Sequence, residues 1–231
     1  MKKLSLYSFL FVGMLVVGLF SVQDARAQGM GPLGEILKRM DDHNKALMSV
    51  QADVTMLKFN PQLNETDTYI GSTSYLPNAK GKRYMRLDWT KPAVEQVSVI
   101  GEDYRLYKPS INQVYIGKVN KAKTSAGAGN ALGFMSMNRE QLRANYNIVY
   151  LGTENAAGVS TWHLQLTPKT ATNYKSAELW VNTDGMPVQA KIFEQNNDTT
   201  TVTLQNVRKN VQISASIFVL NIPKGAKEIK V

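Results

Sequence analysis

Hydrophobic and polar positions near the start of the chain follow two different periods. Over residues 33–48 the apolar positions recur at helical spacing, as Leu33, Ile36, Leu37, Met40, Leu47 and Met48. Pro32 precedes this run, at a position where the first turn of a helix tolerates proline. From residue 50 the period changes to two, with apolar Val50, Ala52, Val54 and Met56. The pattern therefore predicts one amphipathic helix that leads directly into a strand.

Most of the remaining chain consists of short apolar or alternating segments. Those that predict strands are 66–76, 83–89, 94–100, 104–108, 113–118, 147–152, 160–166, 176–181, 187–194, 199–207 and 216–222. Turn signals such as Asp184-Gly185 and Asn196-Asn197-Asp198 separate several of them. About twelve short strands at this regular spacing favour antiparallel connections, and therefore a sandwich or a barrel.

One segment, residues 120–146, interrupts the strands. It begins with the small residues "TSAGAG", which lack the lysine and the preceding buried strand of a phosphate-binding loop. We interpret this stretch as a hinge. The apolar positions that follow predict one or two short helices over 131–145.

The N-terminus has the three zones of a secretory signal. Lys2 and Lys3 form its positive end, residues 4–20 are apolar, and Ala25-Arg26-Ala27 is a small-x-small cleavage site. The apolar run falls short of the roughly 20 apolar residues that a spanning helix needs. We therefore expect cleavage after Ala27, which makes 1–27 a signal peptide and 28–231 a single soluble domain. An uncleaved membrane anchor is the alternative.

Composition and charge narrow the function classes. The sequence contains no cysteine, so an exported domain would rely on a packed core rather than on disulfides, and it would lack the cysteine of a bacterial lipid anchor. The formal net charge of +9 suits anionic lipid headgroups, or simply keeps the surface soluble. Export and the scattered lysines exclude nucleic acid as a partner.

The residues that metal or catalytic sites need are missing from the sequence. His43 and His163 are the only histidines, and neither has metal-ligand spacing. No G-x-S-x-G motif occurs, and pairs such as Asp41-Asp42 are typical of a helix surface. We therefore predict no enzyme, no metal site and no cofactor.

An incompletely closed sheet has an inner face that either fills itself as a core or holds a ligand. In "YMRLDW" (84–89) every second residue, Met85, Leu87 and Trp89, forms the apolar side of the strand. The pattern alone leaves both interpretations of this face open.

Five stretches, taken in order, resemble the LolA family, the periplasmic carriers of outer-membrane lipoproteins. They are "LMSVQADVTM" (47–56), "YMRLDWTKP" (84–92), "GEDYRLYKPSINQVYIGKV" (101–119), "LTPK" (166–169) and "FVLNIPKGAKEI" (218–229). The resemblance lies in their order and spacing across residues 33–231. It implies a mainly β fold with a helical lid (α+β), in which an incomplete, strongly curved antiparallel β-barrel encloses a hydrophobic cavity.

The resemblance also implies a function. A monomeric periplasmic carrier would take acylated lipoproteins from an inner-membrane lipoprotein-releasing ABC transporter and shelter their acyl chains. It would deliver them to the outer membrane, through a receptor where one is present. Three alternatives stay open: a binding protein of the same fold for another lipid or glycolipid, a periplasmic regulator that senses lipoproteins, and a structural envelope protein with a filled core.

Candidate site residues come from the apolar faces and from the resemblance together. The cavity candidates are Met40, Leu47, Val54, Met85, Leu87, Trp89, Val97 and Val99. The lid candidates are Leu132, Phe134 and Met135. The family often has a basic residue before a Pro-Asn pair that locks the closed lid, whereas Leu76 precedes Pro77-Asn78 here. The resemblance therefore leaves Arg83, or else Arg86, as a substitute lock.

Overall fold

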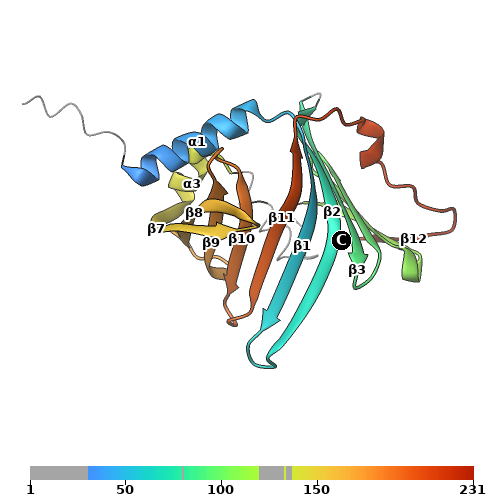
Figure 1. The fold of residues 1–231 in the computed structure, drawn as a ribbon. Helices are drawn as coiled ribbons and strands as arrows, with labels where there is room; N and C mark the ends of the chain where they lie inside the picture. Colours follow the sequence, from blue (N-terminus) through green and yellow to red (C-terminus); the bar gives the residue numbers. More distant parts are fainter. Residues whose placement is uncertain (1–30, 80, 120–132, 134–136) are drawn as a thin grey trace, which may run out of the picture.

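Two helices and twelve strands make up the part of the chain that the structure describes, residues 31–79, 81–119, 133 and 137–231 of a computed structural model (Figure 1). The helices are α1 (Pro32–Ala46) and α3 (Arg139–Asn145). The first six strands are β1 (Val50–Asn60), β2 (Glu65–Ala79), β3 (Lys82–Lys91), β4 (Glu95–Ile100), β5 (Asp103–Lys108) and β6 (Gln113–Lys118). The others are β7 (Tyr146–Ala156), β8 (Val159–Pro168), β9 (Tyr174–Asn182), β10 (Pro187–Glu194), β11 (Thr199–Lys209) and β12 (Lys227–Lys230). Two short 3-10 turns, η1 (Pro109–Ile111) and η2 (Ala215–Phe218), complete the list.

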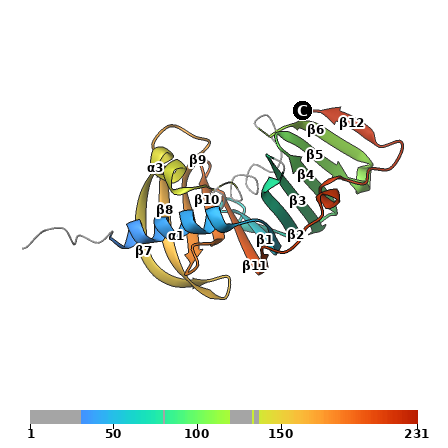
Figure 2. The same ribbon diagram turned by 90° about the horizontal axis from the view of Figure 1, so that it is seen from above.

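All twelve strands belong to one sheet, in the order β12-β6-β5-β4-β3-β2-β1-β11-β10-β9-β8-β7. Every neighbouring pair is antiparallel except β12 and β6, which run parallel. The sheet bends strongly at its middle, so that β7–β10 and β3–β6 form two walls joined through β11, β1 and β2 (Figure 2). Its two edge strands, β12 and β7, do not pair with each other, which confirms the predicted incomplete, curved barrel.

Both helices lie on the concave side of the wall formed by β7–β10 (Figure 2). Helix α1 buries Ile36, Leu37 and Met40, as the helical period predicted, and has three i,i+4 ion pairs on its outer surface. Its backbone lies directly on Gly185, where a Cβ atom would come within 2.2 Å of the Arg39 carbonyl oxygen. None of the described helices is long and apolar enough to cross a membrane.

A capping box begins α3. The Asn138 side chain accepts a hydrogen bond from the Gln141 backbone N–H at 2.8 Å, and the Gln141 side chain accepts one from the Asn138 N–H at 3.1 Å. Leu142 is the buried residue of this short helix. The helix expected over 131–145 is thus confirmed for its C-terminal part, and residues 131, 132 and 134–136 lie outside the described residues.

The C-terminal segment corrects one prediction. Residues 216–222 form no strand; they continue η2 and then cross the convex face of β3–β6 as an irregular segment, here called the strap (residues 214–226). Phe218 packs edge-on against Tyr84, with ring centroids 5.4 Å apart, and Leu220 packs on Tyr107 and Val114. The apolar run that predicted a strand therefore serves packing across the sheet rather than pairing within it.

Strand β12 was not predicted from the sequence. It pairs with β6 from Lys227 to Lys230, which lie across from Gln113 to Ile116. Its four residues are mostly charged and exposed, so neither apolar alternation nor burial marks them as a strand. The parallel direction follows from the strap, which carries the chain back along the sheet before the strand starts.

Candidate functional site

Cross-strand pairing brings the predicted cavity residues together on the concave face of the sheet. Leu87 of β3 lies across from Val97 of β4, and Met85 lies across from Val99. Side chains on one face of a strand alternate with those on the other, so Met85, Leu87 and Trp89 share this face. The apolar side of "YMRLDW" is therefore the concave side.

Most of these residues belong to one buried apolar cluster. Its candidate members are Met40, Val54, Leu87, Trp89 and Val97, each at most 6% exposed, with Leu47 and Val99 packed against them. Met85 lies on the same face and is half-buried. The cluster runs from α1 through β1 to β3 and β4, so it joins the wall beneath the helices to the opposite wall.

Trp89 lies on the apolar face, two residues before the end of β3. Gly71 of β2 lies across from it, and a Cβ atom at Gly71 would come within 2.9 Å of Cε3 of the indole. Tyr69 packs edge-on against the same ring, with centroids 5.7 Å apart. The missing side chain of Gly71 thus leaves the space that the indole occupies.

Tyrosines that the sequence analysis did not single out extend this face upward. Tyr75 lies across from Met85, and Tyr104 lies across from Val99 and is buried. Burial raises the pKa of the Tyr75 hydroxyl, and the Arg83 guanidinium beside it opposes that shift. The period-two alternation of β2 and β5 could have identified both tyrosines once the face of β3 was known.

Charged side chains border the lower end of the apolar face. Lys108 Nζ lies 2.7 Å from Glu95 Oε1, and both side chains are partly buried. The Lys58 ammonium lies 5.4 Å from the ring centroid of Tyr69. The concave face is therefore apolar, with a charged border at this end.

A sequence model of the family described as "Outer membrane lipoprotein carrier protein LolA" matches residues 81–221, more than half of the chain. The chain belongs to the LolA family. The matched region begins at β3 and ends in the strap, so it contains the wall that carries Leu87, Trp89 and Val97. No curated protein matches the sequence significantly.

Solved structures share the LolA-type fold at low sequence identity. An uncharacterized conserved protein from Thermus thermophilus has a TM-score of 0.56 at 13% identity, over 85% of this chain and 98% of that one. MucB has a TM-score of 0.54 at 14% identity, over 81% and 62%. The Pseudomonas aeruginosa MucA/MucB complex has a TM-score of 0.51 at 15% identity, over 81% and 60%. This chain thus corresponds to about three fifths of the length of those MucB chains.

The two candidate lid locks of this LolA-family protein lie on opposite faces of β3. Arg83 is exposed and falls on the concave side, next to Tyr75. Arg86 lies on the convex side, where its Nε donates to both carboxylate oxygens of Asp88, at 2.8 and 2.9 Å. Its Nη1 donates to the Ile217 carbonyl at 2.7 Å, and it lines a cavity of about 440 Å³ beneath the strap. Arg86 therefore holds the strap, and Arg83 is the candidate that faces the concave side.

The lid candidates Leu132, Phe134 and Met135 lie outside the described residues. The described chain resumes at Met137, whose carbonyl oxygen accepts a hydrogen bond from Asn44 Nδ2 of α1 at 3.1 Å. This contact attaches the start of the α3 segment to α1, and the Met137 side chain packs against the apolar cluster.

No group of three potential ligands that could hold a metal ion occurs in the described part of the chain. His163 lies on the convex face, stacked on Trp180 with ring centroids 4.3 Å apart. Its Nδ1 lies 2.9 Å from Glu154 Oε1. His43 is half-buried on α1, where burial and the nearby Lys209 lower its pKa and Asp184 opposes the shift.

Proposed function

We propose that this protein is a periplasmic carrier that shelters the acyl chains of lipoproteins against the concave face of its sheet. The observation that carries the proposal is the continuous apolar cluster that runs from Val54 through Leu87 and Trp89 to Val97. These side chains are at most 6% exposed in this structure, so an acyl chain would reach them in an opened state of the protein. Family membership supports a lipid or lipoprotein ligand.

The energetics of the cargo favour such a site. Each methylene group of an acyl chain exposed to water costs roughly 0.8 kcal/mol, so a lipoprotein leaves a membrane only when another apolar surface receives its chains. A carrier must also release them, which requires that open and closed states differ little in free energy. An unclosed sheet, whose edge strands do not pair, can change its curvature without breaking strand pairs.

The partners in this proposal follow from the transport route. Cargo would come from an inner-membrane lipoprotein-releasing ABC transporter and pass to the outer membrane, through a receptor where one exists. Cleavage after Ala27 would release the chain into the periplasm. MucB, whose fold is similar, forms a complex with MucA, but no described residue of this chain favours a regulator over a carrier.

The proposal is tested by release of an acylated lipoprotein from inner-membrane spheroplasts on addition of residues 28–231. Soluble cargo in a one-to-one complex is the expected result. Met85→Glu places a charge on the half-buried part of the concave face and should abolish release in a folded protein. Gln96→Glu on the convex face of β4 is the matched control and should release cargo normally. Equal release by both variants would contradict the proposal.

A further inference from the structure

Three large aliphatic side chains are exposed at the tips of three alternate turns of the sheet. Leu63 lies in the turn between β1 and β2, Val94 between β3 and β4, and Ile111 between β5 and β6. Their exposed fractions are 65%, 51% and 53%. Alternate turns of an antiparallel sheet lie at the same ends of its strands. All three tips therefore lie along the edge that these strand ends form away from α1 (Figure 1).

The first turn projects furthest. The pairing of β2 with β3 begins at Ile70, which lies across from Lys91, so residues 65–69 of β2 extend beyond the end of β3. Leu57 and Ile70, about 40% exposed each, continue the apolar surface from Leu63 along this hairpin. The tips are separate projections rather than the walls of a groove.

Lysines surround the other tips. Lys91 ends β3, and Lys224 lies in the turn 223–226 that precedes β12. That turn is held beside the tip of β5–β6, because the Lys227 N–H donates to the Asn112 carbonyl at 2.9 Å. Lys91, Lys224 and Lys227 are exposed, and none of them forms an ion pair with a described residue.

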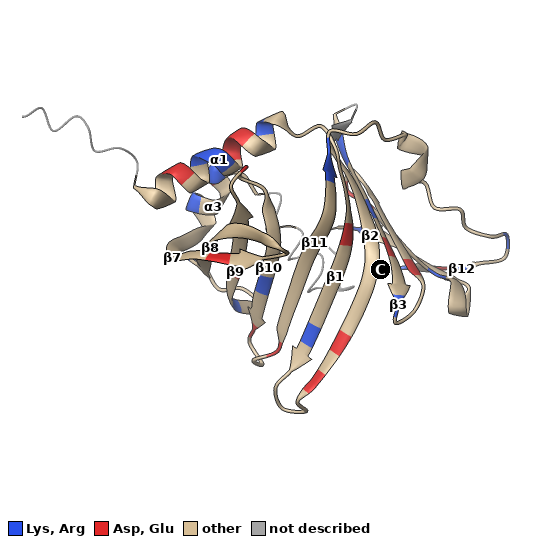
Figure 3. Ribbon diagram, in the orientation of Figure 1, with Lys and Arg blue, Asp and Glu red and all other residues tan. Residues whose placement is uncertain are grey.

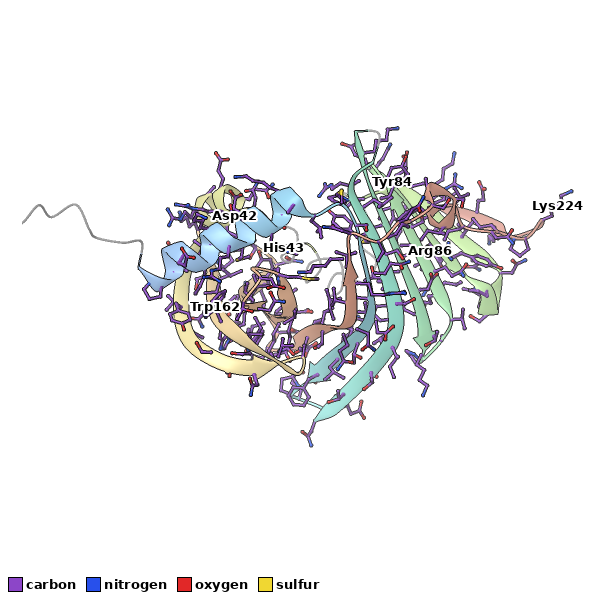
Figure 4. The ribbon with its side chains drawn as sticks, turned by 45° about the horizontal axis from the view of Figure 1, so that its top comes forward. Asp42, His43, Tyr84, Arg86, Trp162 and Lys224 are labelled. Atoms are coloured by element: carbon purple, nitrogen blue, oxygen red, sulfur yellow. The ribbon has the colours of Figure 1, made fainter. Side chains whose placement is uncertain are left out.

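Two other lysines lie at this edge. Lys108 forms an ion pair with Glu95, and Lys58 lies across from Asp67, with its ammonium 5.4 Å from the ring centroid of Tyr69. Figure 3 shows Lys and Arg at the end of β3 and in the loop before β12, and acidic residues in the β2 hairpin and on β12. Lys224 points away from the rest of the molecule (Figure 4).

We propose that this edge, the turn edge (residues 61–64, 92–94, 109–112 and 223–227), docks on an anionic phospholipid bilayer. Leu63, Val94 and Ile111 enter the interfacial region, where exposed aliphatic groups at projecting tips gain burial without needing a complementary protein surface. Lys91, Lys224 and Lys227 lie at the level of the anionic headgroups. The apolar face of the sheet is then held next to the membrane from which an acyl chain would leave.

Single-cysteine labelling tests the proposal cleanly, because the chain has no cysteine of its own. The mature chain, residues 28–231, is labelled with the fluorophore NBD at Leu63→Cys, Val94→Cys or Ile111→Cys. The matched control is Val149→Cys. Val149 is 51% exposed and lies on β7, the strand at the far side of the sheet from β5 and β6. Each protein is mixed with phosphatidylcholine vesicles that contain about 30% phosphatidylglycerol, an anionic content that attracts basic surfaces. The vesicles are prepared with and without nitroxide-labelled lipid.

We expect the three turn-edge labels to shift to the blue and to be quenched by nitroxide lipid, and the label at 149 to do neither. Replacing Lys91, Lys224 and Lys227 with glutamine should weaken vesicle affinity about tenfold or more. Unchanged fluorescence at the turn edge would overturn the proposal, as would an equal response at position 149 or on pure phosphatidylcholine vesicles. No lipoprotein is present in this experiment, so its failure is distinct from failure of the carrier function.

Discussion

Gly71 of β2 lies across from Trp89 of β3, and the indole ring occupies the space that a side chain at Gly71 would need. A Cβ atom there would come within 2.2 Å of the Asp88 carbonyl oxygen and within 2.9 Å of the ring. The sheet and the apolar face therefore both depend on this glycine.

Gly71→Ala should lower the free energy of unfolding by about 2 kcal/mol, because backbone and indole must both move to accept the methyl group. Urea unfolding followed by circular dichroism measures the change. Gly31→Ala is the control, since a Cβ atom at Gly31 would meet no atom within 4 Å beyond its chain neighbours. Equal stability of the two variants would contradict the tight packing described at Gly71.

Arg83→Leu tests the proposed lid lock. If Arg83 donates hydrogen bonds that hold a closed state over the concave face, their loss should speed dissociation of a bound fatty-acid probe by about tenfold, the equivalent of one to two hydrogen bonds. Stopped-flow displacement of the probe measures this rate. Arg105→Leu, an exposed position on the convex face of β5, should leave the rate unchanged. Identical rates for both variants would remove Arg83 from the mechanism.

Arg86→Met tests the attachment of the strap. The substitution removes the donor to the Ile217 carbonyl and leaves the partly buried Asp88 carboxylate without its partner. We expect the free energy of unfolding to fall by about 2 kcal/mol, with faster amide exchange across residues 214–222. Exchange that is unchanged in this segment would show that Arg86 does not hold the strap.

The pH dependence of stability tests the environment of His43. Burial and Lys209 lower the pKa of His43 in the folded protein below its ordinary value of 6.5, so the folded state favours the neutral ring. Protonation then favours unfolding, and the stability present above pH 6.5 is lost as the pH falls through and below that value. His43→Gln should therefore lose less stability than the wild type between pH 7 and pH 5, as measured by urea unfolding. Parallel curves would contradict this account.

Alternation with a period of two correctly predicted the apolar face of β3. The apolar residues of the strap, however, were wrongly predicted to form a strand. In β3, strict alternation separates Leu87 from Arg86, so the sequence alone identified the face that carries the apolar cluster. Residues 216–222 have a similar apolar character, but their neighbours are the side chains of β3–β6 rather than a strand edge. The local hydrophobic pattern does not show whether an apolar segment pairs with a strand edge or packs on the face of a sheet.

Other parts of the site depend on pairing between distant strands. Nothing near Gly71 in the sequence shows that an indole covers it, and the role of Tyr104 becomes visible only when β5 pairs with β4. Alternation places Arg83 and Arg86 on opposite faces of β3, yet only the structure shows that Arg86 binds the strap. Long-range register, rather than composition, decides each of these roles.

Contact between an acyl chain and Trp89 is the most direct test of the carrier account. Two variants each retain one of two indoles, Trp89 on the concave face or Trp180 on the convex face, with the other tryptophans, Trp162 included, replaced by phenylalanine. Titration with a brominated fatty acid, which quenches fluorescence on contact, should quench Trp89 and leave Trp180 unchanged. Quenching of Trp180 alone, or of neither indole, would contradict an acyl-binding concave face.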